Sequence, residues 1–334
     1  MFIVISFQKV RIMIFVKKWL LIVMFSLPFT SMAQDTLVNK LDSLSRKKDS
    51  AGKQINNINP KAYNQTTELD LKSYFILLGS SLKQEFTKPF HMTKKDWRNF
   101  GIFTGGAAAV YFFADKPIQQ AALRLRNRNT VLNNVSKYVT NFGGLYEGYT
   151  LIGLAGYGLL FKDKKIVTTT LLATQSYVTA GALESVLKFL TGETRPTYYA
   201  AGVEAKPRFL GPFSKVGKSA SGKTEYSSFP SGHTTVAFAA ATVFASEYRD
   251  KPIIPVIAYS AATLIGISRI TENKHWTTDV LAGAAVGFLS GKQVVNNYHR
   301  YAKIKMGQKE KNTVSFSLHY NYDHLEPGLV YHFR

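Results

Sequence analysis

A cation, an imidazole and a carboxylate lie close together between Ser268 and Asp279, just before an apolar segment. If that segment is helical, His275 and Asp279 lie four residues apart on one face near its start. A carboxylate at this spacing accepts the Nδ1 proton of the imidazole, which leaves Nε2 to attack an electrophile or bind an oxyanion. Arg269 adds a planar fork of donors suited to phosphate. The stretch therefore indicates chemistry on an anionic group.

Two polar blocks farther upstream also lie at the edges of apolar segments. The first runs from Lys188 to Pro196 and carries two cations, Lys188 and Arg195. The second, from Phe229 to Thr234, reads Phe-Pro-Ser-Gly-His-Thr and opens the next apolar segment. Charged side chains at such edges can meet in the fold without being buried unpaired. We therefore expect the three blocks to form one site.

Five residues of these blocks are suited to binding a phosphate group. A phosphoryl group in transfer carries negative charge on its equatorial oxygens, so its catalysis depends mainly on positioning and charge stabilisation. Lys188, Arg195 and Arg269 supply three permanent cations for those oxygens. Ser231 and Gly232 add a hydroxyl and a backbone N–H at an expected helix start, where the helix dipole favours an anion.

The order and spacing of the blocks resemble a known family. The chain reads Lys-x6-Arg-Pro from Lys188, then Pro-Ser-Gly-His from Pro230, then Ser-Arg-x5-His-x3-Asp from Ser268. This pattern resembles the type-2 phosphatidic acid phosphatase and vanadium haloperoxidase superfamily over the segment from Phe100 to Val295. Three complete blocks in one order form a far more specific signal than any single block.

The resemblance implies a role for each remaining residue. It implies that His275 is a nucleophile that forms a phosphohistidine, that Asp279 orients it, and that His233 protonates the leaving oxygen. It also implies an all-α, six-helix phosphatidic acid phosphatase-type bundle. The mechanism needs no metal and no other cofactor, and the sequence offers no second carboxylate–histidine cluster.

Each residue also has a purely structural interpretation. Lys188 suits a cation at a helix end, Arg195 with its proline a helix stop, and Ser231 a helix cap. Arg269 has an ion-pair partner within reach in Glu272, and His275 with its carboxylate four residues on suits a structural hydrogen bond. Their joint occurrence in a fixed order favours the catalytic interpretation.

The sequence leaves three hypotheses for function. The first is a metal-independent phosphatase that hydrolyses a phosphate monoester or pyrophosphate, of a lipid or of a small ester, through a phosphohistidine. The second is a vanadium-dependent haloperoxidase, since the same residues can hold vanadate. The third is a non-enzymatic phosphate-binding envelope protein. The two histidines and Asp279 argue against the third, because a binder needs only the cations.

The composition narrows the class of partner. The chain has 42 Lys and Arg against 21 Asp and Glu, a formal charge of +21. No basic motif interleaved with aromatic residues accompanies that excess, so we expect no nucleic-acid partner. An anionic membrane surface or substrate fits better. The absence of cysteine excludes thiol catalysis, disulfides and cysteine-bound metal, and no pattern indicates an oligomeric state.

The N-terminal residues predict export. Lys17 and Lys18 precede a short apolar run, and Ser31 and Ala33 place small residues before a cleavage site. Residues 1–33 are typical of a signal peptide, with an uncleaved anchor helix as the alternative. Residues 34–71 are polar and predict a linker before a helical domain at 72–300.

Apolar segments predict the helices of that domain, because they are too long for typical strands. The segments are Phe100–Ala114, Tyr149–Phe161, Ile166–Leu190, Thr234–Ser246, Ile253–Ser268 and Val280–Gly291. Weaker amphipathic character marks Leu71–Phe86, and the polar stretch 116–143 has room for an additional helix. The long loop Tyr198–Ser228 suits a lid or a substrate-contacting flap.

The C-terminal residues alternate in polarity and predict a β-hairpin at 313–334 that packs on the helical domain. Its first strand is expected over Thr313–Tyr322, its turn over Asp323–Gly328, and its second strand from Leu329.

Basic residues at alternate helix ends predict where the site lies. They follow or precede the apolar segments at the ends away from the three blocks, so the positive-inside rule places the blocks on the extracytoplasmic side of the cell envelope. Most uncharged runs are shorter than the ~20 residues of a spanning helix. We expect membrane association, with a lipid phosphate as the substrate.

Overall fold

The computed structural model describes residues 66–334 except 200–202, 213–226, 310–312, 322–323 and 333–334. The predicted signal peptide (1–33) and nearly all of the predicted linker (34–71) lie outside the described residues. The described part is mainly helical, as the apolar segments predicted.

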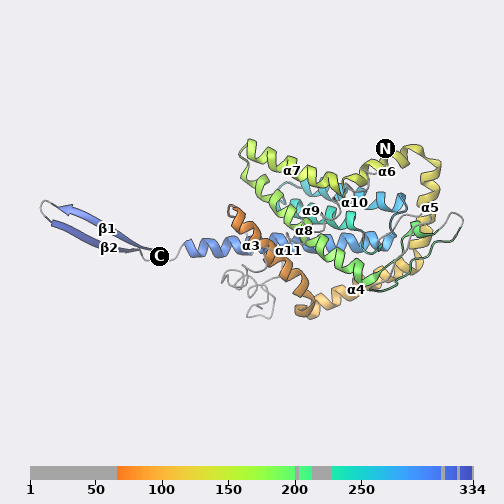
Figure 1. Ribbon diagram of the computed structural model, residues 1–334, viewed down its shortest axis with the longest axis horizontal. Coiled ribbons are helices and arrows are strands. Elements are labelled where there is room, and N and C mark those ends of the chain that lie inside the picture. Colours follow the sequence, from red (N-terminus) through yellow and green to blue (C-terminus); the bar gives the residue numbers. More distant parts are fainter. Residues whose placement is uncertain (1–65, 200–202, 213–226, 310–312, 322–323, 333–334) are drawn as a thin grey trace, which may run out of the picture.

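The elements follow one another along the chain as nine α-helices, two short 3₁₀ helices and two strands in the described residues (Figure 1). They are α3 (Leu71–Thr87), η2 (Lys88–His91), α4 (Lys94–Phe113), α5 (Asp115–Arg128), α6 (Thr130–Asn141), α7 (Leu145–Leu160), α8 (Lys164–Thr191), η3 (Pro196–Tyr198), α9 (Gly232–Glu247), α10 (Ile253–Thr271), α11 (Thr277–Lys309), β1 (Thr313–Asn321) and β2 (His324–His332).

The prediction of six helices was too low. The six apolar segments correspond to α4, α7, α8, α9, α10 and α11. Helix α3 matches the amphipathic stretch Leu71–Phe86, and the stretch 116–143, where one additional helix was expected, holds most of α5 and all of α6. Helix α5 is strongly polar, and α3 buries the hydroxyls of Ser80 and Ser81. Helix α11 also runs well past Gly291, because its polar second half buries Val294 and Tyr298 in the core. Apolar composition alone does not reveal helices of this kind.

Helix α9 lies at the centre of the bundle, in contact with α8, α10 and α11. Its Val243 packs with Leu172 of α8 and Val294 of α11 in the main core. Its Ala237 packs with Ile265 of α10 in a second cluster. Because α9 is covered on these sides, the residues at its first turn are held between the ends of the neighbouring helices.

Glycines let α11 approach the backbone of α9 closely. A Cβ on Gly287 would overlap the carbonyl oxygen of Thr235 and lie 2.8 Å from the amide nitrogen of Ala239. Gly283 and Gly291, one turn to either side, face the same backbone. Larger side chains there would push the two helices apart, so these glycines fix the distance between the second and third blocks.

Helix α8 ends within the first block, at residues that favour a helix end. Gly192 follows the helix with φ 56°, in the left-handed region that glycine adopts without strain. Its N–H donates to the carbonyl of Lys188, and η3 begins at Pro196. Lys188 therefore lies in the last turn of α8, and Arg195 lies on the loop that follows.

The outer faces of several helices are apolar and exposed. Within the described residues, α10 is the helix that is long and apolar enough to cross a membrane, by length and composition. Its exposed large apolar side chains are Ile253, Val256, Ile257, Leu264 and Ile267. Helices α4 and α7 also expose large apolar side chains, among them Phe112, Ile152 and Leu160.

The two strands pair antiparallel, from Thr313 with His332 to Asn321 with His324. Strand β2 thus begins earlier than the predicted start at Leu329. Pro327 and Gly328, which were assigned to the turn, instead pair within the ladder, and proline is tolerated in a strand at an edge. Figure 1 shows the hairpin beyond the end of α11 and apart from the helices. This differs from the expectation that the hairpin packs on the helical domain.

Candidate active site

The three blocks meet at one end of the bundle. The ammonium of Lys188 donates to the carbonyl of Pro230 at 2.7 Å, which joins the first block to the second. The N–H of Ser231 donates to the carbonyl of Asp279 at 3.0 Å, which joins the second to the third. Nη1 of Arg195 donates to the carbonyl of Lys274 at 3.1 Å, which joins the first block to the third.

His275 and Asp279 form a buried pair at the start of α11. Nδ1 of His275 lies 3.3 Å from Oδ2 of Asp279, and the two side chains are 2% and 0% exposed. The same carboxylate oxygen accepts the N–H of Trp276 at 2.8 Å and the hydroxyl hydrogen of Ser228. The indole N–H of Trp276 donates to the carbonyl of Thr194 at 2.8 Å. The turn before α11 is therefore held around the carboxylate.

The surroundings of His275 keep its imidazole neutral. Burial lowers its pKa well below the usual range, and the charges of Arg195, Lys188 and Arg269 lower it further. With its proton on Nδ1 toward Asp279, the ring presents the Nε2 lone pair to the guanidinium of Arg195, whose Nη1 lies 3.3 Å away. Nε2 is thus a neutral nucleophile beside a donor for an anion.

Lys188 is held by backbone carbonyls. Its ammonium lies 3.0 Å from the carbonyl oxygen of Ser227, 3.4 Å from that of Ser228 and 2.7 Å from that of Pro230. Oε1 of Glu184, one turn earlier on α8, lies 3.1 Å away. In this arrangement the cation fixes the loop that carries the second block and contributes its field to the site.

Arg269 lies near the end of α10 and is 7% exposed. Its Nη1 donates to the hydroxyl of Thr140 on α6, and it lies 3.2 Å from Oε2 of Glu272. The ion pair of the structural interpretation is therefore present. The Nε–H group has no hydrogen-bond partner among the described residues, so the guanidinium retains a donor for another acceptor.

The second block begins α9. The hydroxyl of Ser231 accepts the hydroxyl hydrogen of Thr234 at 2.9 Å and makes no side-chain capping bond to the helix. Ser231 therefore occupies the N-cap position of α9, but its side chain does not cap the helix. A Cβ on Gly232 would lie 2.6 Å from Oε1 of Glu184, so only glycine fits without a shift of that carboxylate.

His233 lies in the first turn of α9 against the turn between α6 and α7. A Cβ on Gly144 would lie 3.3 Å from Nε2 of His233, which places the ring edge at this turn. Burial lowers the pKa of His233 to about 4, and Arg269, Arg195 and Lys188 contribute to the shift in the same direction. Both site histidines are therefore neutral near pH 7 before an anion enters.

Sequence reasoning missed three residues of this site. Ser228 binds the Asp279 carboxylate, Thr140 binds Arg269, and Glu193 is a fully buried carboxyl group behind the pair. The position of Ser228 just before the second block was the one available signal. Among the described residues, no group of three or more His, Cys, Asp or Glu side chains is arranged to hold a metal ion.

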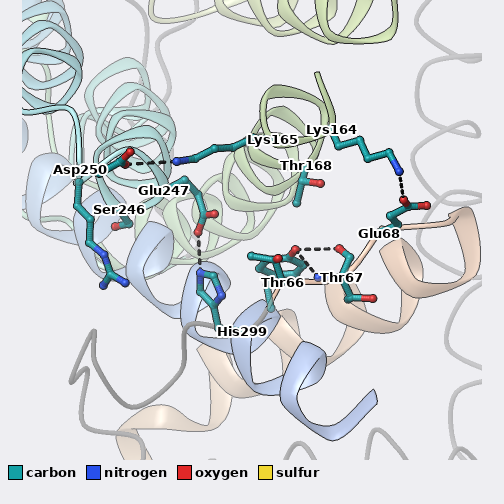
Figure 2. Close-up of a pocket in the computed structure, with 12 residues that line it drawn as sticks. Thr66, Thr67, Glu68, Lys164, Lys165, Thr168, Ser246, Glu247, Asp250 and His299 are labelled. Atoms are coloured by element: carbon teal, nitrogen blue, oxygen red, sulfur yellow. Dashed lines mark hydrogen bonds and ion pairs between the residues drawn. The ribbon is translucent and has the colours of Figure 1, made fainter. Parts of the chain in front are cut away.

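A pocket of about 650 Å³ lies at the opposite ends of the same helices. Figure 2 shows that it is lined by the start of α8, the end of α9, Glu68 before α3 and His299 of α11. Three pairs form among its charged side chains: Lys164 with Glu68, Lys165 with Asp250, and His299 with Glu247. It contains none of the residues of the three blocks.

Comparison with known proteins gives one family. Residues 169–302 match the sequence profile described as the PAP2 superfamily. That segment contains all three blocks, from Lys188 to Asp279.

Two curated relatives are similar over parts of the chain. The lipid A 1-phosphatase of Porphyromonas gingivalis is 54% identical over 69 residues, which are 20% of this chain and 16% of that protein. The phosphatidylglycerophosphatase B of Bacillus subtilis is 29% identical over 184 residues, 53% of this chain and 79% of that protein. The chain thus spans less than a fifth of the first of these relatives.

A solved structure also aligns with the chain. It is the crystal structure of a transmembrane PAP2-type phosphatidylglycerolphosphate phosphatase from Bacillus subtilis, with a TM-score of 0.43 and 25% sequence identity. The alignment covers 62% of this chain and 94% of that chain.

Proposed function

Because residues 169–302 belong to the PAP2 superfamily, we propose that the chain is a phosphatase that forms a phosphohistidine on His275. Its substrate is a phosphate monoester or pyrophosphate, and no metal takes part. One observation carries the proposal: Nε2 of a buried, neutral His275 lies 3.3 Å from Nη1 of Arg195, while Nδ1 is held by Asp279. A nucleophile and an anion-binding fork at one point suit phosphoryl transfer.

The chemistry proceeds in two displacements at phosphorus. Nε2 of His275 attacks phosphorus, the bond from phosphorus to the leaving oxygen breaks, and His233 gives that oxygen a proton. Water then attacks the phosphohistidine, His233 takes a proton from it, and the P–N bond breaks to release phosphate. Asp279 stabilises the positive charge that the imidazole carries while it is bonded to phosphorus.

A bound phosphate also allows His233 to take up the proton that it later gives to the leaving oxygen. Arg195, Arg269 and Lys188 lower the pKa of His233 in the free site, after the effect of burial. A phosphate dianion among those cations offsets their charge, so the pKa of His233 rises as substrate binds. The acid is thus formed when its proton is required.

The five phosphate-binding residues divide into three kinds. Arg195 and Arg269 direct guanidinium donors at the transferred oxygens. Ser231 and Gly232 line the start of α9, where the helix dipole favours an anion. Lys188 contributes charge and holds the loop of the second block, given its bonds to three carbonyls of that loop.

A lipid phosphate suits the surroundings of the site. Exposed apolar faces on α4, α7 and α10 support a membrane-associated chain, with the site on the extracytoplasmic side of the envelope. The relatives named above are a lipid A 1-phosphatase and a phosphatidylglycerophosphatase. A lipid substrate would reach the site laterally, with its headgroup at the level of the three blocks.

A release assay tests the proposal. The purified protein in detergent, with excess chelator, is given soluble phosphate esters and lipid phosphates, and released phosphate is measured. We expect at least one lipid phosphate to release phosphate faster than the soluble esters do. In His275→Ala this release should be lost, while the helical circular dichroism stays unchanged. Equal rates in the variant and wild type would contradict the assignment of His275. Halide oxidation that requires added vanadate, without phosphate release, would replace phosphatase by haloperoxidase.

A further inference from the structure

Glu193 occupies a fixed place behind the His275–Asp279 pair. It lies between the end of α8 and η3, and its side chain is 0% exposed. Its N–H donates to the hydroxyl of Ser227 at 2.9 Å, and its carbonyl accepts the N–H of Ser228 at 2.8 Å. The backbone is thus joined to the segment of chain that binds Asp279, and the carboxyl group has little freedom to move.

The carboxyl group of Glu193 faces that of Asp279. Among the described residues, no N–H or hydroxyl group donates to either oxygen of Glu193 or to Oδ1 of Asp279. After burial, the nearby charge of Asp279 is the strongest influence on the carboxyl group of Glu193, so the three oxygens without a donor belong to two interacting carboxyl groups. A hydrogen bond between two carboxyl groups requires a proton on one of them, because two buried carboxylates in contact repel strongly.

The other contacts decide which group holds the proton. Oδ2 of Asp279 faces three donors, Nδ1 of His275, the N–H of Trp276 and the hydroxyl of Ser228. Oδ2 thus accepts three hydrogen bonds, and Oδ1 is the oxygen of Asp279 left to accept one from Glu193. Glu193 receives none among the described residues, so its neutral form is favoured.

Burial and the neighbouring carboxylates raise the pKa of Glu193, and one neighbouring cation lowers it. Burial raises the pKa of Glu193 well above its usual range, and Asp279 on α11 and Asp115 on α5 raise it further. Lys188 on α8 opposes them. Tyr111 on α4 also interacts with Glu193; burial first, and then nearby groups, raise the pKa of Tyr111, which remains neutral at physiological pH.

We infer that Glu193 is a positioning residue whose carboxyl proton is donated to Oδ1 of Asp279. This bond keeps one negative charge beside the imidazole and turns Oδ2 toward Nδ1 of His275. The inference rests on the proposed function, since it concerns how the nucleophile is oriented. Glu193 is not one of the defining positions of the family pattern.

Two substitutions separate the effect of the hydrogen bond on kcat from the effect of side-chain volume. Glu193→Gln keeps the length and supplies an N–H donor, so we expect kcat within about threefold of wild type. Glu193→Ala leaves Oδ1 of Asp279 without a donor, so we expect kcat to fall by roughly ten- to a hundredfold with KM nearly unchanged. The same pair of changes at Glu85, a buried carboxyl that accepts from Ser290 on another part of α11, should leave kcat unchanged.

The pH profile supplies a readout that packing alone would not move. Glu193 ionises as pH rises through its raised pKa, and the wild-type kcat should then fall as the second charge appears beside Asp279. Glu193→Gln cannot ionise, so its profile should lack that decline. A profile of identical shape in wild type and Glu193→Gln would overturn the inference, as would equal kcat values for Glu193→Ala and wild type.

Infrared difference spectroscopy locates the proton without relying on turnover. At neutral pH, wild type minus Glu193→Gln should show the C=O stretch of one protonated carboxyl group. A carboxylate band in its place would overturn the inference, whatever the activity. A protonated band in a protein without phosphatase activity would support the proton assignment while the proposed function fails. If Glu193→Ala does not fold, Glu193→Gln decides both measurements.

Discussion

Replacement of Asp279 by asparagine tests the charge of the carboxylate separately from its shape. The amide that replaces the carboxylate would keep an oxygen where Oδ2 accepts the N–H of Trp276 at 2.8 Å, so the turn before α11 should persist. The change removes the negative charge that faces Nδ1 of His275. Binding of substrate by the cations should survive, while formation of the phosphohistidine should slow.

The size of the effect follows from the distance between the charges. Nδ1 of His275 and Oδ2 of Asp279 are 3.3 Å apart, and a full charge pair at this separation is worth about 5 kcal/mol at an effective dielectric constant of about 20. A neutral hydrogen bond to the amide oxygen retains about 1 kcal/mol. The remaining ~4 kcal/mol corresponds to a loss of about a thousandfold in kcat.

The assay is steady-state phosphate release by Asp279→Asn, with kcat and KM measured separately. Glu85→Gln is the matched control, since it also replaces a buried carboxyl by an amide but lies against Ser290, away from the site. We expect the control to keep kcat within about threefold and Asp279→Asn to keep KM. A kcat for Asp279→Asn within tenfold of wild type would refute the charge argument.

Three further predictions follow from the packing and charge of the site. Gly287→Ala places a Cβ against the carbonyl oxygen of Thr235 and should destabilise the fold by about 1–3 kcal/mol, whereas Gly153→Ala meets nothing within 4 Å and should not lower Tm. The pKa of His233, about 4 in the free site, should rise on vanadate binding, and an unchanged NMR titration would contradict the role of the cations. Lys188→Met removes a buried cation that binds three carbonyls and should lower kcat/KM by about a hundredfold; a loss below threefold, at equal folded fraction, would show that the ammonium is dispensable.

The sequence was most informative where contacts are local. The four-residue spacing of His275 and Asp279 predicted that their side chains meet, and they do at 3.3 Å, although His275 lies in the turn before α11 and not on its face. Gly192 and Pro196 likewise mark the end of α8 through their own backbone preferences. The spacing did not show that Asp279 also binds Trp276, since that bond depends on the turn before the helix.

The sequence was least informative where contacts are distant. Glu193 looks like a solvated loop residue in the sequence, and its burial depends on packing against α11, far along the chain. Thr140 reaches Arg269 from a helix 129 residues earlier. The second half of α11 is polar in composition, yet its Val294 and Tyr298 are buried in the core. Such features depend on tertiary packing, which residue type and periodicity do not reveal.

The central claim is a covalent bond between phosphorus and Nε2 of His275. The most direct test is to mix the enzyme with substrate carrying radiolabelled phosphate, denature it in alkali within one turnover, and locate the label by peptide mass spectrometry. We predict alkali-stable, acid-labile phosphate on the peptide that contains His275, lost on a chase with unlabelled substrate and absent in His275→Ala. Label on another residue, or turnover by wild type with the His275 peptide unlabelled at every time point, would contradict the account.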